Sequence, residues 1–276
     1  IGRSALTTLT TNAANTAVGG TALSANTAAN NTAVGYAALA ANTSGTENVA
    51  VGALAGDALT TGSRNTAVGY IALSAATTAS DNSAFGREAL RDNTSGNSNT
   101  ALGKEAMKLN TTGVENTAVG HHALNVNTSG GNNTAIGRLA LVLNTTGSLN
   151  TAVGVAVLDA NTSGASNTGL GSAALTSNTT GAYNTAVGAS SGFATTTGTS
   201  NVSMGFESFY YNTTGIDNVA IGSDALKANT TASNNTAIGK GAAVVVTTGA
   251  ENTIVGYTAG DSLTTGNANV LIGKHC

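Results

Sequence analysis

The 276-residue sequence has no proline, no tryptophan and one cysteine, and only 8% of its residues are charged. The single cysteine, Cys276, excludes an intrachain disulfide framework. The formal net charge of −3 gives no electrostatic reason to expect nucleic acid or an anionic membrane as a partner. No apolar run reaches the roughly 18 residues that a membrane-spanning helix needs, and no signal peptide is recognisable.

A five-residue stretch, Asn-Thr-Ala-Val-Gly, dominates what the sequence does contain. Its first interval is 16 residues and every later interval is 17. The opening asparagine falls at Asn15, Asn31, Asn48, Asn65, Asn82, Asn99, Asn116, Asn133, Asn150, Asn167, Asn184, Asn201, Asn218, Asn235, Asn252 and Asn269. A fixed period of this length indicates a repeat array, in which each repeat contacts only its neighbours. We therefore treat residues 1–276 as one array of about 16 coils. Because it begins and ends within a repeat, we expect it to be a fragment of a longer array.

Each repeat position, counted from the asparagine as position 1, has its own residue preference. Position 3 is nearly always Ala, position 4 is aliphatic or a similar apolar residue, position 5 is Gly and position 9 is usually Leu. A second Asn often fills position 12. Stacked coils turn such positions into ladders. The predicted structural ladders include Asn31, Val34, Gly35 and Leu39 in one coil and Asn116, Val119, Gly120 and Leu124 in another.

The spacing of glycine and asparagine argues against a helical hairpin. Gly at positions 5 and 15 costs roughly 1 kcal/mol each inside a helix relative to Ala, and Asn and Thr are poor helix formers. Two short extended segments, near positions 1–4 and 8–13, with glycine at the corners fit better. The sequence therefore predicts an all-β fold, a parallel β-solenoid or β-roll with 17-residue coils.

Adjacent apolar residues at positions 3 and 4 raise a packing question. Neighbouring residues of a strand face opposite sides, so one column points into the coil and the other points out. A long exposed apolar column is unusual in a soluble monomer, so burial against sister chains, as in a homotrimer, is expected. The alternative is that position 3 is small merely because it lies in a bend.

Three coils replace the usual Leu at position 9 by Gly56, Gly192 or Gly260. Leu59 and Leu263 then occupy position 12 in the first and last of these coils. We expect local repacking of the same apolar column.

The repeat unit resembles the head repeats of YadA-like trimeric autotransporter adhesins, with Asn218–Gly222 and Asn48–Gly52 nearest to that signature. It also resembles repeats of phage and bacterial tail-fibre proteins that carry an endosialidase-type chaperone domain. The resemblance covers the whole chain. It implies a parallel β-roll, usually homotrimeric, on a bacterial cell surface or virion. The 17-residue period is longer than is usual in YadA-like heads, and no neck, stalk or anchor is recognisable.

Catalytic and metal-binding patterns are hard to find. His121 and His122 are adjacent at positions 6 and 7, where other coils carry Arg87 and Glu88 or Lys104 and Glu105. This variable corner suits either surface decoration or recognition, and a metal site would need further ligands. We therefore predict no enzyme, no cofactor and no structural metal.

One coil concentrates aromatic residues, namely Phe206, Phe209, Tyr210 and Tyr211. Phe209 takes the place of the core Leu at position 9. Phe206, Tyr210 and Tyr211 suggest either a glycan contact or ordinary packing.

These observations favour a structural and adhesive fibre segment, a surface-exposed extracellular rod that attaches to host cells, matrix or other fibres. Its expected partners are copies of itself, as a homotrimer or filament, and a host glycan or protein. A phage tail-fibre shaft and a self-assembling filament subunit are alternatives. An ice-binding solenoid is a further alternative because Thr recurs at positions 2, 13 and 14, although positions 13 and 14 are adjacent and must face different ways.

Overall fold

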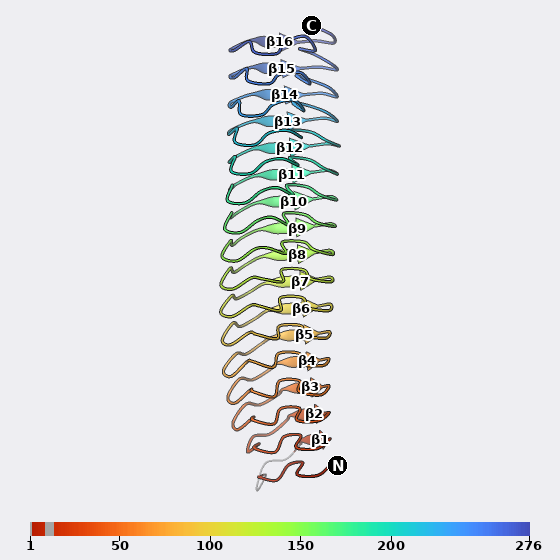
Figure 1. Cartoon of the computed structure of the whole chain (residues 1–276), viewed down its shortest axis with the longest axis vertical. Helices are drawn as coiled ribbons and strands as arrows, with labels where there is room; N and C mark the ends of the chain where they lie inside the picture. Colours follow the sequence, from red (N-terminus) through yellow and green to blue (C-terminus); the bar gives the residue numbers. More distant parts are fainter. Residues whose placement is uncertain (1, 9–13) are drawn as a thin grey trace. The chain divides into compact units, whose positions relative to one another are not determined.

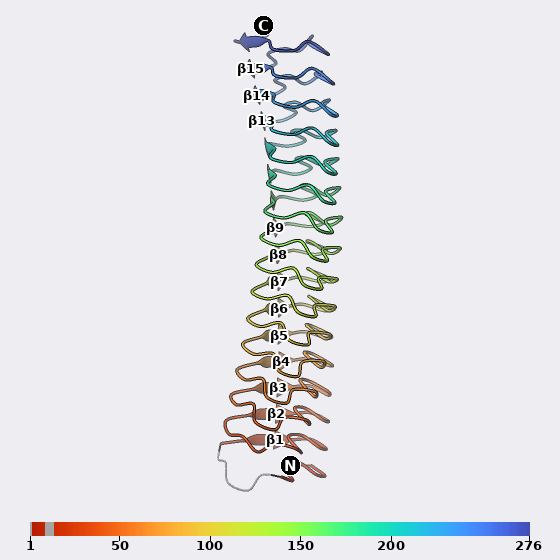
Figure 2. The ribbon, with the colours of Figure 1, turned by 90° about the vertical axis from the view of Figure 1, so that its left-hand side faces the viewer.

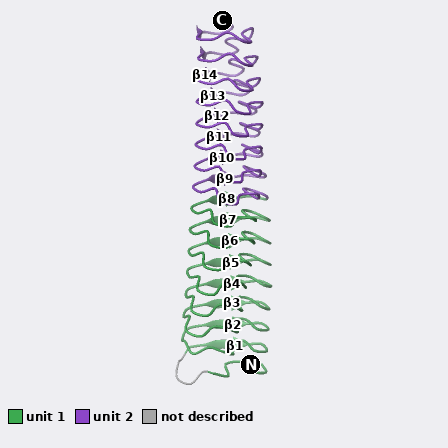
Figure 3. Cartoon of the chain, turned by 60° about the vertical axis from the view of Figure 1, so that its left-hand side comes forward, with its two compact units in different colours: residues 1–138 green, residues 139–276 purple. Residues whose placement is uncertain are grey.

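A computed structural model describes residues 2–8 and 14–276 (Figure 1). Ile1, which the repeat places at position 4, lies outside the described residues. The chain forms two compact units, residues 1–138 and residues 139–276, coloured separately in Figure 3. Each unit is a parallel β-solenoid, and the described residues make about 15 turns of about 17 residues. They contain no helix, and therefore none long and apolar enough to cross a membrane. The all-β solenoid predicted from the repeat is confirmed.

Every strand has three residues and occupies positions 2–4 of a repeat. Unit 1 contains β1 (Thr16–Val18), β2 (Thr32–Val34), β3 (Val49–Val51), β4 (Thr66–Val68), β5 (Ser83–Phe85), β6 (Thr100–Leu102), β7 (Thr117–Val119) and β8 (Thr134–Ile136). Unit 2 contains β9 (Thr151–Val153), β10 (Thr168–Leu170), β11 (Thr185–Val187), β12 (Val202–Met204), β13 (Val219–Ile221), β14 (Thr236–Ile238), β15 (Thr253–Val255) and β16 (Val270–Ile272). Within each unit successive strands pair in parallel, in the register that the repeat requires, as in Ala33↔Ala50.

The strands show which apolar column faces the interior. The position 3 side chains, such as Ala33 and Ala118, are fully buried inside the coil. The position 4 side chains lie on the outer face of the sheet. Val34 and Val119 are half-buried there, and Leu102 is 49% exposed. The Val-type ladder therefore exists in the predicted register, and it lines the outside of the coil.

The interior of each coil is narrow and is filled by positions 3, 8 and 9. Leu39 and Leu124 are fully buried at position 9, and Phe209 is 1% exposed in the same column. Phe209 thus replaces the core leucine, as the sequence predicts. Full burial of each such side chain stabilises the fold by about 1.5–3 kcal/mol.

The prediction of a second extended segment at positions 8–13 is wrong. Residues 35–42 form successive tight turns, in which Ala38 N–H donates to Gly35 O and Asn42 N–H donates to Leu39 O. Leu39 itself adopts a left-handed φ of 50°. Contacts between coils persist through isolated bonds, such as Leu39 N–H to Ala55 O at 3.1 Å, but no ladder long enough for a strand forms. In the view of Figure 2 the strands of each unit line one side of the coils and these turns project from the other.

Glycine at position 5 is required by both conformation and space. Gly35 has a φ of +138° and Gly120 a φ of +133°, a region that side chains rarely adopt. A Cβ atom on Gly35 would lie 2.4 Å from the carbonyl oxygen of Gly52, and one on Gly120 would lie 2.6 Å from that of Gly137. The predicted glycine corner is confirmed at this position.

The three coils with Gly at position 9 are repacked locally, as expected. Gly56 has a φ of +57°, and a Cβ there would lie 3.0 Å from Leu59 Cδ1, so the Leu59 side chain enters the space that the position 9 leucine normally fills. Around Gly260 the larger Ile254 at position 3 does the same, with Cδ1 3.1 Å from the site of a Cβ. Glycine also removes the cost of roughly 1–2 kcal/mol that a leucine in left-handed backbone carries.

Buried amide ladders hold consecutive coils together. Asn116 Nδ2 donates to Gly130 O at 2.9 Å in its own coil and to Asn99 Oδ1 at 3.1 Å in the preceding one. Its Oδ1 accepts the backbone N–H of Asn133 at 2.9 Å. Asn31 likewise donates to a carbonyl of its own coil, Gly45 O at 2.8 Å, and accepts from Asn48 N–H at 3.0 Å, but another Nδ2 bond goes to Asn26 Oδ1 at position 12 of the preceding coil. The position 1 ladder is therefore confirmed, and a second ladder joins position 12 residues.

Candidate functional surfaces

The outer sheet face, defined as the side chains at positions 2 and 4 of β1–β16, carries no charged residue. Position 2 is Thr in 11 strands, Val in 4 and Ser in 1, which accounts for all 16 described strands. Position 4 is Val, Ile, Leu, Met or Phe throughout. Since β-branched side chains are stiff, this face is rigid as well as uncharged. Within each unit it forms two unbroken columns, one of hydroxyls and methyls and one of larger apolar groups.

One edge of the outer sheet face, at position 17, carries polar residues in most coils, with the exposed Leu149 and Tyr183 among the exceptions. Position 17, just before the strand, carries Arg64 and Asp81 in consecutive coils, paired through Nε to Oδ1 at 2.6 Å and Nη2 to Oδ2 at 2.9 Å. This guanidinium holds the pKa of the Asp81 carboxyl below its usual value. An apolar centre with a polar border is the arrangement found in protein interfaces.

We use the name aromatic corner for Phe193, Tyr210 and Tyr211, which are joined by ring contacts, together with Phe206 at position 6 of the same coil as Tyr210. Phe193 and Tyr210 hold position 10 in consecutive coils and stack with centroids 4.8 Å apart and an interplanar angle of 3°. The Tyr211 ring stands edge-on to that of Tyr210, with centroids 4.7 Å apart at 77°. Phe206 is 55% exposed and Tyr211 is 53% exposed. The structure therefore brings Tyr210 and Tyr211 together and adds Phe193, which the sequence did not single out.

An ion cluster adjoins the aromatic corner. Lys227, which follows Tyr210 in the position 10 column, donates to Glu207 Oε2 at 2.5 Å and to Asp224 Oδ1 at 2.8 Å. Both carboxylates raise the pKa of the Lys227 ammonium, Asp224 more than Glu207. Asp224 also accepts from the Ser223 hydroxyl at 3.0 Å, and the pKa of its carboxyl is lowered chiefly by the Lys227 bond. Side chains at positions 7 and 10 thus meet across neighbouring coils.

The histidine pair lies in the other unit. His121 is exposed and His122 is half-buried, with ring centroids 4.1 Å apart. His122 Nε2 lies 3.6 Å from Glu105 Oε2. Burial lowers the pKa of His122, His121 adds to this effect, and Glu105 opposes it. His121 and His122 thus lie together, in a different unit from the aromatic residues.

Next to the histidines is a charge network that the sequence analysis missed. Glu88 is only 5% exposed and accepts from Arg87 at 2.5 Å, Arg91 at 3.0 Å and Lys108 at 2.7 Å. The Lys108 bond is the largest cause of the lowered pKa of Glu88. The network could have been predicted from the sequence, because charged residues recur at positions 6, 7 and 10 in two consecutive coils. Since cations of the same cluster pair with each carboxylate, the network stabilises the turns of these two coils.

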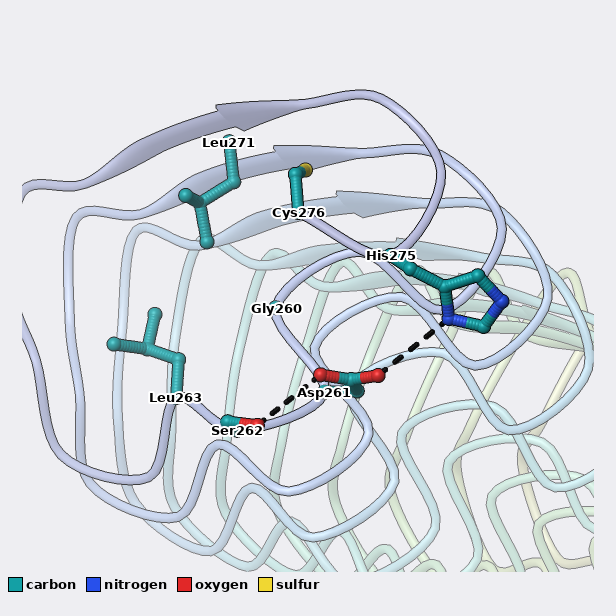
Figure 4. A pocket seen from close by; sticks show the side chains of 7 residues that line it. All are labelled: Gly260, Asp261, Ser262, Leu263, Leu271, His275 and Cys276. Atoms are coloured by element: carbon teal, nitrogen blue, oxygen red, sulfur yellow. Dashed lines mark hydrogen bonds and ion pairs between the residues drawn. The ribbon is translucent and has the colours of Figure 1, made fainter.

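No group of three or more histidine, cysteine, aspartate or glutamate side chains arranged to hold a metal ion occurs in residues 2–8 and 14–276. A pocket of about 450 Å³ lies at the last coils, beside Asp261, Leu263, Leu271, His275 and Cys276 (Figure 4). Asp261 Oδ2 lies 3.6 Å from His275 Nδ1. Leu263 and Leu271 line the pocket with apolar surface.

Comparison with known proteins finds no matching family model, no matching curated protein and no matching solved structure.

Proposed function

We propose that this chain is a structural and adhesive fibre segment that works as an assembly of several copies, with a homotrimer as the expected form. In this proposal the stacked coils supply a stiff extracellular shaft on a bacterial surface or virion, and its corners contact the attachment target. The role requires no turnover and no cofactor. Its likeness to adhesin heads and tail-fibre shafts rests on the repeat unit alone.

The outer sheet face is the observation that carries the proposal. Its position 4 side chains include Val18, Leu102 and Ile136, which are 44%, 49% and 40% exposed. Completing the burial of one such side chain contributes roughly 0.5–1.5 kcal/mol, because full burial is worth about 1.5–3 kcal/mol. Eight repetitions in a unit give a sum comparable to the roughly 4–15 kcal/mol that association costs. A face built this way is stabilised by a matching face on another copy.

The test is the molar mass in solution, measured by light scattering on the whole chain. The wild-type chain is expected to give at least twice its 26.7 kDa mass, and three times that mass for the expected homotrimer. Charges placed on the face by Val51→Glu with Leu102→Glu are expected to yield monomers. The control variant Ser44→Glu with Ser95→Glu adds the same charge at exposed position 14 and should keep the assembly. A wild-type monomer, or a face variant that assembles as well as its control, refutes the proposal.

Ice binding is a second candidate, favoured by the threonine column of the same face. Position 2 threonines point outward beside position 4, so the face presents a regular array with a repeat of about 4.8 Å along the stacking direction. Bulky residues such as Phe85, Leu102 and Met204 interrupt its regularity, which favours protein contact instead. Thermal hysteresis in a concentrated solution of monomeric chain would support ice binding, and none at all would exclude it.

A further inference from the structure

We propose that the aromatic corner and the adjoining ion cluster form a binding site for a neutral hexose-containing glycan. The inference rests on the proposed role in attachment, because it names the chemical class to which the segment attaches. The site combines the exposed Tyr211 ring with the polar groups of Glu207, Asp224 and Lys227.

The rings of the corner are not demanded by the fold. Tyr211 holds position 11, where the coils on either side carry Ala194 and Ala228, and Phe206 holds position 6, where they carry Ala189 and Ser223. Those coils have the same strands and the same turn bond from position 8 N–H to position 5 O, so small residues suffice for the scaffold. The aromatic side chains therefore add exposed apolar surface that the solenoid does not need.

Ring orientation makes Tyr211 the platform. Phe193 and Tyr210 stack on each other, so each covers one face of the other ring. Tyr211 meets Tyr210 at 77°, so Tyr210 can cover at most one face of the Tyr211 ring, and the Tyr211 side chain is 53% exposed. An aromatic face carries negative quadrupole charge and attracts the polarised C–H groups of a pyranose ring. The stacked Tyr210 ring contacts the Tyr211 ring and so restricts its orientation.

The ion cluster offers hydrogen-bond acceptors to a ligand, and its net charge favours a neutral ligand over an anionic one. Lys227 uses one oxygen of Asp224 and one of Glu207, so both carboxylates keep acceptor capacity for sugar hydroxyls. The three side chains together carry one net negative charge, which disfavours an anionic sugar. Because each group is held by its partners, little side-chain entropy is lost on binding.

Binding can be measured on the whole chain by saturation-transfer difference NMR. The probes are the methyl β-glycosides of galactose, glucose and N-acetylglucosamine, each in large excess. At least one is expected to receive magnetisation from the protein. Tyr211→Leu should reduce the transfer at least fivefold, Tyr211→Phe should keep more than half of it, and Glu207→Gln should weaken it because a carboxylate acceptor is lost.

Tyr183→Leu is the matched control, since Tyr183 is also exposed but lies outside the corner. It should leave the transfer unchanged, and circular dichroism should show the same fold for all variants. No transfer to any glycoside, or equal loss in Tyr183→Leu and Tyr211→Leu, overturns the site. The outcome is independent of the molar mass test, because a monomer can bind sugar and an assembly can fail to bind it.

Discussion

Asn65 offers the sharpest test of how the solenoid is held together. Its Nδ2 donates to Ala79 O at 2.8 Å, and its Oδ1 accepts the backbone N–H of Asn82 at 3.1 Å. The coil has Ala76 at position 12, so no second amide approaches the Ala79 carbonyl. Asn65→Ala therefore leaves two buried backbone groups without these partners. At about 1–3 kcal/mol for each unsatisfied group, the expected loss of stability is about 2–6 kcal/mol.

Asn93 is the matched control, since it is buried just as fully. Its Nδ2 donates to Gly96 O at 2.9 Å, but Asn82 Nδ2 also donates to that carbonyl at 3.0 Å. Its Oδ1 accepts from Asn110 Nδ2, which keeps a bond to Gly113 O at 3.1 Å. Asn93→Ala therefore orphans no backbone group and should cost about 0.5–1.5 kcal/mol, as for an ordinary hydrogen bond.

The measurement is native-state hydrogen exchange of the whole chain, followed by mass spectrometry on peptides that cover the mutated coil. Exchange reports the local opening free energy, which suits a repeat array whose unfolding is not all-or-none. Asn65→Ala should lower protection by the larger amount in its own coil and in the coil of Asn82. Equal effects of Asn65→Ala and Asn93→Ala would refute the assignment of separate roles to the two ladders.

Three further predictions follow from single coils. Gly56→Leu should lower the thermal unfolding midpoint by overpacking, and Leu59→Asn should lower it by leaving a cavity, at a cost of about 1–5 kcal/mol each. The double variant should recover most of this loss. If the two losses simply add, the repacking is contradicted. Gly120→Ala should cost more than about 2 kcal/mol because of its positive φ and the nearby carbonyl, whereas Gly131→Ala should stay within about 1 kcal/mol of wild type in chemical denaturation. Burial raises the pKa of Asp57, so its folded form holds a proton at higher pH than its unfolded form, and stability should fall as pH rises above about 4; Asp57→Asn should flatten that part of the stability profile measured by denaturant titration.

The repeat predicted much of the fold because, in stacked coils, the repeat length determines which residues of neighbouring coils lie next to each other. The 17-residue spacing alone placed Asn116 over Asn99 and Gly35 over Gly52, and the structure has those contacts. The direction of the position 3 and position 4 side chains stayed open, since alternation says that they differ and not which one faces inward. The extended segment at positions 8–13 was wrong because left-handed backbone at Leu39 has no sequence signal.

The candidate sites also combine features that the sequence could predict with features that it could not. The aromatic residues were visible in the sequence as a local excess, and the structure pairs Tyr210 with Phe193 from the preceding coil. That partner could have been found by aligning position 10 between coils. The burial of Glu88 among three cations could not, because it depends on how long side chains reach between coils. Side-chain reach is not encoded in the period.

The two asparagine columns differ in how freely they are interrupted, and the structure gives the reason. Position 1 is Asn in every coil, whereas position 12 becomes Leu, Ala, Thr or Val in several, namely at Leu59, Ala76, Thr195, Val246 and Leu263. The position 1 amide bonds a backbone carbonyl in its own coil and a backbone N–H in the next, so any replacement disturbs backbone in two coils.

The position 12 amide bonds a carbonyl that position 1 already satisfies, as Gly45 O shows by accepting from both Asn31 and Asn42. Asn212 and Asn229 also accept the backbone N–H groups of Gly215 and Ala232, but where the position 12 Oδ1 bonds only the next amide, an interruption leaves a side-chain oxygen without a donor. The buried Oδ1 atoms of Asn42 and Asn178 are in this state, and the next coils carry Leu59 and Thr195 in their column. The chain can therefore vary position 12 to adjust its core, since the breaks after Asn42 and Asn178 each leave one unsatisfied side-chain acceptor and keep the backbone carbonyl bonded by position 1.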